Sequence, residues 1–171
     1  MKLIRTLAIL ALAVAPLGCG AQDGVAPRAT ETAAAEPASA TQQPVLVVHK
    51  TPWCGCCTAW AEQAQAAGFD VELHDHDDLA PIKQALGVPM SQASCHTVQV
   101  GNYFVEGHVP FEDVHRLLAE QPDALGIAVP GMPLGSPGME ADVKHSFSTN
   151  LVKADGSIVE YAHHPGDDAQ R

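Results

Sequence analysis

The stretch that decides the fold is VLVVHKTPWCGCC, residues 45–57. Its first six residues favour a β-strand, and a helix-like run over 59–67 follows its last cysteine. Between them, Cys54 and Cys57 stand in CxxC spacing, so the first thiol lies at the amino end of a helix. Backbone N–H groups there stabilise a thiolate and lower the pKa of the thiol. A thiolate is a nucleophile and a ligand for soft metal ions, and a third cysteine, Cys56, favours the metal.

Strand and helix patterns alternate along the rest of the chain. Predicted strands cover 45–50, 69–74, 97–100 and 103–106, and predicted helices cover 54–67, 79–86 and 110–121. A Pro- and Gly-rich loop, 129–139, precedes two closing strands, 147–153 and 157–161, that flank an Asp-Gly turn. The order β-α-β-α-β-β-α is the thioredoxin order. We therefore predict an α/β, thioredoxin-like fold, with a central mixed sheet flanked by helices and an extra C-terminal β-hairpin.

The amino terminus indicates export. A short basic start precedes an apolar stretch, 7–17, that is too short to span a bilayer, which is the pattern of a secretion signal. Cleavage after Ala21 would remove a signal over 1–21 and leave a periplasmic protein. The alternative is a lipoprotein anchored at Cys19, because the residues that end there resemble part of a lipobox. Pro16 replaces the usual aliphatic residue of that motif, so we place simple secretion first.

Composition predicts one acidic domain behind a tether. Residues 22–43 are mostly Ala, Thr, Glu, Pro and Gln and read as a disordered tether. We predict a single metal-binding domain over 44–162 and a flexible tail over 163–171, whose His163 and His164 would bind metal only weakly. Without its signal the chain has 7 basic and 20 acidic residues, a formal charge of −13. That charge argues against a nucleic-acid partner.

A fourth cysteine of the domain, Cys95, is predicted to join the other three. The segment SCHTVQVGN, 94–102, matches a glutaredoxin pattern in register, with Cys95 and His96 at the Val and cis-Pro positions. In thioredoxin folds that loop lies against the CxxC motif. The register therefore brings a fourth thiol to the site, unless Cys95 is simply a buried core thiol. Loss of the proline also alters the loop on which a dithiol oxidoreductase docks its substrate.

Thiolates select Cu(I), Zn(II) or iron–sulfur clusters. Zinc sites usually use paired motifs with a longer separation than this one. Cys56 and Cys57 are neighbours that cannot comfortably chelate one tetrahedral ion, so bridging thiolates in a small multi-copper cluster fit better. In an oxidising compartment Cys54 and Cys57 can pair instead as a disulfide. A purely structural disulfide with spare thiols is the simpler alternative.

Further candidate ligands are less specific. Met132 and Met139 flank the rigid loop and offer thioethers suited to Cu(I), although each could instead fill a hydrophobic gap. His96 is a candidate ligand or a residue that shapes its loop. We expect His108 to be structural.

Three other histidines are expected to have no site role. His49 is predicted to be a strand residue, and His74 and His76 a solvated strand edge.

Several separated motifs together resemble one family. They are KTPWCGCC at 50–57, ASCHT at 93–97, VEGHVP at 105–110, VPGMP at 129–133 and GSPGM at 135–139. The chain resembles the CopG-like copper-resistance family, whose thioredoxin-like domain was long described as one of unknown function. The resemblance covers about 45–161.

The resemblance implies an exported copper- or silver-resistance protein that binds Cu(I) as its cofactor and takes part in copper redox handling. The family's cysteine motifs fall on Cys54, Cys56, Cys57 and the Cys95-His96 pair. The implied partners are copper ions and other periplasmic copper-handling proteins, with a membrane only through a lipid at Cys19.

Two classes of function remain open at this point. The first is a periplasmic copper-binding protein, with copper oxidoreductase activity as an open question. The second is a thiol–disulfide oxidoreductase acting on proteins, with Cys54 as nucleophile and Cys57 as resolving thiol. A passive metal buffer is a third, weaker candidate. Cys56 and the Cys95-His96 pair favour the first class, since an exchange enzyme needs neither.

Overall fold

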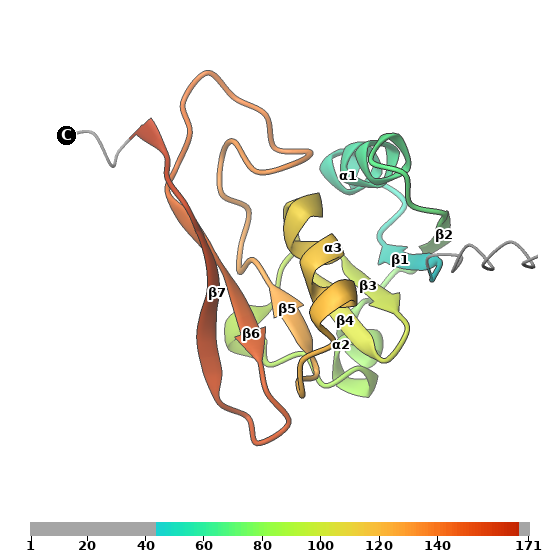
Figure 1. Cartoon of the computed structure of the whole chain (residues 1–171). Helices are drawn as coiled ribbons and strands as arrows, with labels where there is room; N and C mark the ends of the chain where they lie inside the picture. Colours follow the sequence, from blue (N-terminus) through green and yellow to red (C-terminus); the bar gives the residue numbers. More distant parts are fainter. Residues whose placement is uncertain (1–43, 168–171) are drawn as a thin grey trace, which may run out of the picture. The chain divides into compact units, whose positions relative to one another are not determined.

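The computed structural model describes residues 44–167. Its elements, in chain order, are β1 Leu46–Lys50, α1 Gly55–Ala66, β2 Val71–Asp75, α2 Ala80–Ala85, the 3₁₀ helix η1 Met90–Gln92, β3 Thr97–Val100, β4 Tyr103–Glu106, α3 Phe111–Glu120, β5 Gly126–Ala128, β6 Phe147–Val152 and β7 Ile158–His164 (Figure 1). The predicted signal, tether and lipid site at Cys19 lie outside the described residues. Within them, no helix has the length and apolar character needed to cross a bilayer.

The strands form one mixed sheet in the order β2-β1-β3-β4-β5-β6-β7. β1 pairs in parallel with β2 and antiparallel with β3, and β3 pairs antiparallel with β4. These four strands and the three α-helices reproduce the thioredoxin order, which confirms the predicted fold class. The short strand β5 is parallel to β4 and antiparallel to β6, so it joins the β6–β7 hairpin to the sheet.

The main core lies between the sheet and the helices α1 and α3. Leu46 and Val48 alternate inward from β1 and pack in one cluster with Trp60 of α1 and Leu117 of α3. Trp60 has no exposed surface, and its indole N–H donates to the carbonyl of Val109 at 3.0 Å. A smaller cluster that includes Val88 and Phe104 packs separately, with Leu86 at the end of α2 against it. The arrangement fixes the amino end of α1 at the carboxyl end of β1 (Figure 1).

Two features differ from the sequence prediction. β5 was not predicted, because a three-residue strand has no periodicity of its own. The predicted start of the flexible tail, at His163, was wrong, because β7 continues to His164. There the imidazole Nε2 lies 2.8 Å from Asp113 Oδ2 and the ring stacks on Phe147 with centroids 4.8 Å apart. Contacts with residues distant in the sequence, rather than local strand propensity, extend β7 to His164.

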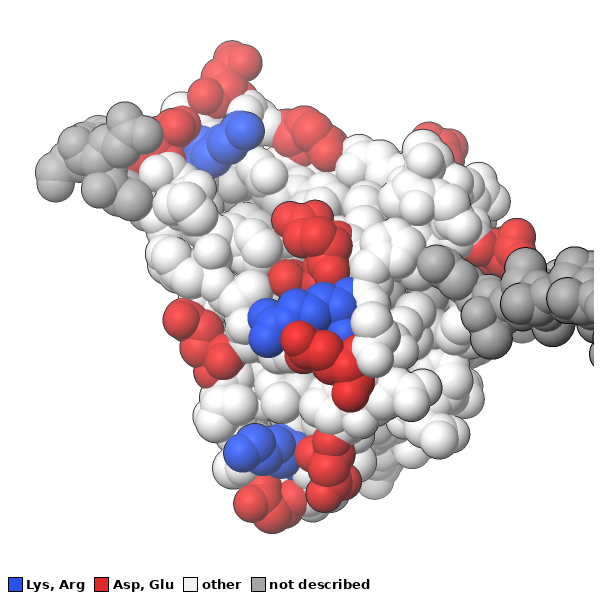
Figure 2. Space-filling model, viewed as in Figure 1, with Lys and Arg blue, Asp and Glu red and all other residues white. Residues whose placement is uncertain are grey.

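The surface carries its charges in a mixed pattern. Figure 2 shows Lys and Arg in small groups that each touch Asp or Glu, with uncharged surface between them. On the face shown, the described residues form no broad basic area, which is the feature that phosphate-backbone binding requires.

The position of β5 predicts that substitution by alanine destabilises the protein more at one isoleucine than at another. Ile127 of β5 has no exposed surface, whereas Ile158 at the start of β7 is 40% exposed. Ile127→Ala should lower the free energy of unfolding by about 2–5 kcal/mol, because it leaves a cavity in the main core. The control Ile158→Ala should cost about 1 kcal/mol or less. Urea denaturation measures both values, and equal losses would place β5 outside the core.

Candidate metal centre

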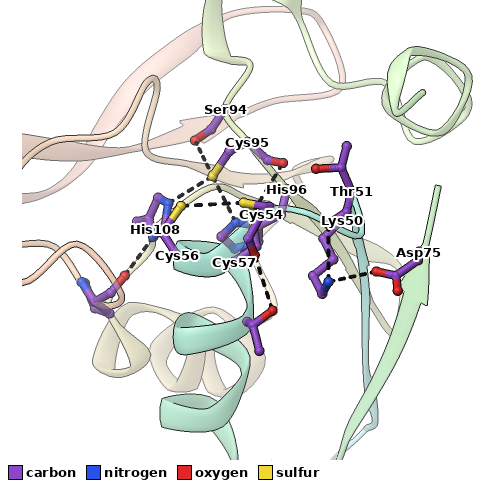
Figure 3. Close-up of a disulfide and its surroundings, with 12 residues drawn as sticks. Lys50, Thr51, Cys54, Cys56, Cys57, Asp75, Ser94, Cys95, His96 and His108 are labelled. Carbon is purple, nitrogen blue, oxygen red and sulfur yellow. Dashed lines mark hydrogen bonds and ion pairs between the residues drawn. A yellow bond between two sulfur atoms is a disulfide. The ribbon is translucent and has the colours of Figure 1, made fainter. Parts of the chain in front are cut away.

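The structure brings four cysteines together at one end of the sheet. The sulfur atoms of Cys54, Cys56, Cys57 and Cys95 all lie within 4.8 Å of one another (Figure 3). Cys54 caps the amino end of α1, and Cys56 and Cys57 lie in its first turn. Cys95 comes from the segment between η1 and β3. The predicted register of the glutaredoxin-like segment therefore places the fourth thiol correctly.

The four thiols are not equivalent. Cys54 and Cys57 are joined by a disulfide, and Cys56 and Cys95 are free. The Sγ of Cys56 lies 3.5 Å from that of Cys54. Cys57 has no exposed surface, while the other three are partly exposed. The cluster therefore opens to solvent on one side and is closed on the other by the core.

The thiol of Cys95 is held in its protonated form. Burial, followed by the neighbouring Cys56, raises the pKa of Cys95 to about 12. A thiolate at Cys95 is thus unfavourable in the metal-free protein, because it would be poorly solvated and would repel other sulfurs. A soft metal ion bound among the four sulfurs would have to displace the proton of Cys95 and would then supply the positive charge that stabilises its thiolate.

His108 also belongs to this site, although the sequence led us to expect a structural role. Its Nε2 lies 2.9 Å from the Sγ of Cys95, and its Nδ1 lies 2.7 Å from the carbonyl oxygen of Pro137. A carbonyl only accepts, so Nδ1 carries the proton and donates to it. Burial lowers the pKa of His108, which keeps the ring neutral and leaves Nε2 with its lone pair facing the cysteine. This is the orientation that metal-ligating histidines take when a backbone carbonyl fixes the tautomer.

His108 could have been found from the hairpin register. β3 and β4 pair with Thr97 opposite Glu106, so the residues before Thr97 lie beside those after Glu106. The backbone N–H of Gly107 donates to the carbonyl of His96 at 3.0 Å and continues that pairing. The predicted hairpin therefore already implied that His108 lies beside the Cys95-His96 pair.

His96 is fully buried between Trp60 and His108. Each of those rings lies 5.0 Å from the His96 ring, centroid to centroid. Its Nδ1 lies 3.4 Å from the Sγ of Cys95, and its Nε2 has no hydrogen-bond partner among the described residues. Burial lowers the pKa of His96 well below its usual value, so the imidazole is neutral. Ligand atoms of Cys95, His96 and His108 lie within 4.8 Å of one another, which gives a second group of metal-ligating atoms centred on Cys95.

A buried ion pair positions the segment that carries Cys95 and His96. Glu106 has no exposed surface and accepts hydrogen bonds from the Lys83 ammonium, from Ser94 N at 2.6 Å and from Thr97 Oγ1 at 2.7 Å. Burial raises the pKa of Glu106, and the Lys83 ammonium opposes that rise. Sequence patterns gave no sign of this pair, because its members are isolated charges on different elements.

The Pro- and Gly-rich loop lies against the site from the other side. Gly131 accepts a hydrogen bond from Ser94 Oγ, and a Cβ at Gly138 would lie 2.6 Å from the carbonyl oxygen of Cys56. Met139 of this loop is partly exposed and Met132 is 52% exposed. A ligand role for either methionine stays a prediction.

The fold and the site together define a thioredoxin-like protein with a cysteine cluster that could hold metal ions. Residues 92–139 match the family described as "Protein of unknown function, DUF411", and no curated protein matches the chain. Two solved structures are similar to it, described as copper resistance protein CopG, form 1 and form 2. They share 42% and 41% identity with this chain, each with a TM-score of 0.69, and each match covers 72% of this chain and 99% of the other. The chain belongs to the CopG copper-resistance family.

The contact between the loop and α1 predicts different effects at two glycines. Gly138 and Gly131 both have positive φ, 79° and 70°, but a Cβ meets the backbone of α1 only at Gly138. Both alanine substitutions carry the left-handed backbone penalty of about 1–2 kcal/mol. Gly138→Ala should cost a further amount of about 1–3 kcal/mol, because the loop must move off the helix. Urea denaturation of both variants measures the difference, and equal losses would rule out this contact.

Proposed function

We propose that this chain is an exported protein of copper resistance that binds Cu(I) through Cys54, Cys56, Cys57 and Cys95. The observation that carries the proposal is the convergence of four sulfur atoms within 4.8 Å in a member of a copper-resistance family. Of the two oxidation states of copper, thiolates prefer Cu(I). A thiolate–metal bond of about 2.3 Å, as in zinc sites, puts two sulfurs on one ion at most roughly 4.6 Å apart. Only small shifts are therefore needed once the disulfide is reduced.

The proposed site holds a small multi-copper cluster rather than one ion. Cys56 and Cys57 are adjacent on the first turn of α1, so their thiolates suit bridging between ions better than chelation of one ion. His108 and His96 offer neutral imidazoles beside Cys95, and Met132 and Met139 of the loop are further candidate ligands. These groups extend the donor set beyond four sulfurs and favour more than one ion.

The proposed chemistry couples copper to the Cys54–Cys57 pair. Two thiols that form one disulfide release two electrons and two protons, and each Cu(II) takes up one electron. One reduced pair can therefore convert two Cu(II) ions to Cu(I), which the remaining thiolates then bind. Bound Cu(I) in turn protects reduced thiols by mass action. In the reverse direction the Cys54–Cys57 disulfide takes one electron from each of two Cu(I) ions, together with two protons, and becomes two thiols, which makes the chain a copper oxidant. Copper oxidoreductase is therefore the proposed enzyme class.

A thiol–disulfide oxidoreductase acting on proteins is the second candidate. The disulfide at the start of α1 and the 71% exposed Trp53 beside it favour that function. By the predicted register, Cys95 and His96 take the place of the proline with which such an enzyme docks its substrate, and the thiol of Cys95 lies beside the disulfide instead. We therefore rank copper chemistry first.

The proposed location is the periplasm. A signal over 1–21, a tether over 22–43 and a domain that begins at 44 would give a free exported protein, and processing at Cys19 would give a lipoprotein. Copper ions and other periplasmic copper-handling proteins are the proposed partners.

The cluster predicts a metal count. Anaerobic titration of the reduced protein with Cu(I) should end above one ion per chain. Cys95→Ser should weaken Cu(I) binding nearly as much as Cys57→Ser, because both sulfurs belong to the same group, and the exposed Ser157→Ala should leave it unchanged as a control. A limit of one ion, or retention of Zn(II) against a Cu(I) competitor, would exclude the cluster. Unchanged binding in Cys95→Ser would remove Cys95 from the site.

The redox coupling predicts a stoichiometric reaction. Reduced protein mixed with Cu(II) should lose two thiols for every two Cu(I) ions formed, and Cys54→Ser should lose this reaction while it keeps the fold. Thiol assay and a Cu(I)-specific chromophore follow both quantities, and circular dichroism checks the fold. An insulin reduction assay runs in parallel. Strong insulin reduction without copper-coupled thiol loss would reverse the ranking of the two functions.

A further inference from the structure

A group of three histidines lies on the sheet edge formed by β1 and β2. His49 of β1 and His74 of β2 are direct partners in the parallel register, so their side chains project from the same face of the sheet. His76 is two residues beyond His74 and therefore projects the same way, and its backbone N–H donates to the carbonyl of Lys50 at 2.8 Å. The rings of His74 and His76 lie 5.5 and 5.1 Å from that of His49, centroid to centroid. From the sequence we expected only a strand residue and a solvated edge here.

Two of the three imidazoles, those of His49 and His76, have nitrogen atoms close enough to share an ion. His49 Nδ1 lies 2.9 Å from His76 Nε2. Two nitrogens bound to one metal ion at about 2.0–2.1 Å are roughly 2.8–3.4 Å apart, for bond angles between a right angle and the tetrahedral angle. Rotation of the two rings, with loss of the proton that they share, would convert the contact between these imidazoles into coordination of a common ion. β2 is the edge strand of the sheet and His74 is exposed, so an ion has direct access.

The surrounding charges suit a divalent cation. Glu72 Oε2 lies 3.6 Å from His74 Nε2 and faces the same side, two residues before it on β2. The nearest ammonium on these strands, that of Lys50, projects from the opposite face and is paired with Asp75 at 2.8 Å. Burial, and then the two neighbouring histidines, lower the pKa of His49, which keeps its lone pair available at neutral pH.

We propose that His49 and His76, with His74 and Glu72 beside them, form a second metal site for a borderline divalent transition-metal ion. Imidazoles favour Cu(II), Zn(II) and Ni(II), and Cu(II) binds most tightly among these ions to a given nitrogen site. The site offers nitrogen atoms as ligands, whereas the cysteine cluster offers sulfur atoms. It lies on the face of the sheet opposite to the Lys50 side chain. It does not depend on the function proposed for the cysteines.

The test uses Cu(II) and a full-length chain that cannot react with it through free thiols. In this chain Cys19→Ser, Cys56→Ser and Cys95→Ser leave only Cys54 and Cys57, which stay oxidised as a disulfide. Equilibrium dialysis gives the affinity, and electron paramagnetic resonance reports nitrogen ligands. His74→Gln with His76→Gln should weaken Cu(II) binding at least about tenfold and remove nitrogen coupling. The matched control, His145→Gln with His163→Gln, removes two other exposed histidines and should change the affinity less than about twofold.

A second measurement leaves every histidine in place. Zn(II) added to the same chain should change the nitrogen-15 chemical shifts of the imidazole Nδ1 and Nε2 atoms of His49, His74 and His76. The corresponding shifts of His145 and His163 should stay unchanged. Loss of Cu(II) binding in the control pair rather than in the His74 and His76 pair would overturn the proposal. Imidazole spectra at the sheet edge that do not respond to Zn(II) would overturn it as well.

Discussion

The cysteine site depends on one buried carboxylate. Glu106 ends β4 and binds Ser94 N and Thr97 Oγ1, which lie on either side of Cys95 and His96. The carboxylate therefore fixes both ends of the segment that brings the fourth thiol to α1. Lys83 of α2 supplies the opposite charge and also donates to Thr97 Oγ1 at 2.9 Å. Removal of one member of a buried ion pair typically costs about 3–5 kcal/mol, because the other charge is left unpaired. The pair thus couples α2, β4 and the Cys95 segment into one unit.

Sequence patterns predicted the parts of this molecule that local periodicity and known registers determine. The thioredoxin order, the β3–β4 hairpin and the approach of Cys95 to the CxxC motif follow from such signals. β5, the end of β7 and the Glu106–Lys83 pair do not, since each exists only through contacts between distant elements. His108 is an intermediate case. Its place followed from the hairpin register, but its role as a neutral imidazole with Nε2 toward Cys95 required the carbonyl of Pro137, which comes from the long loop.

Electrostatics limits the states in which the four sulfurs can exist together. Cys57 is fully buried, and the pKa of Cys95 is raised to about 12, so several thiolates at this spacing are unfavourable without compensation. The compensation comes from a covalent bond, from protons or from metal ions. The structure contains the first at Cys54–Cys57 and leaves Cys56 and Cys95 as free cysteines. Oxidation and soft-metal binding compete for the sulfurs of Cys54 and Cys57, while Cys56 and Cys95 stay available to copper in both states. This competition is the physical basis of the proposed copper redox chemistry.

Strand β1 links the two proposed metal sites. It carries His49 on one face and leads at its end to the turn in which the backbone N–H of Cys54 donates to the carbonyl of Thr51 at 3.1 Å. The imidazoles at its edge favour Cu(II), whereas the thiols beyond its end favour Cu(I). Under the two proposals, one short piece of chain joins a site that prefers Cu(II) to a site that prefers Cu(I). An electron from the Cys54–Cys57 thiol pair turns Cu(II) into Cu(I) and so shifts the preference of the ion from imidazole to thiolate. The thiol pair that supplies the electron would therefore also determine which of the two proposed sites the ion prefers.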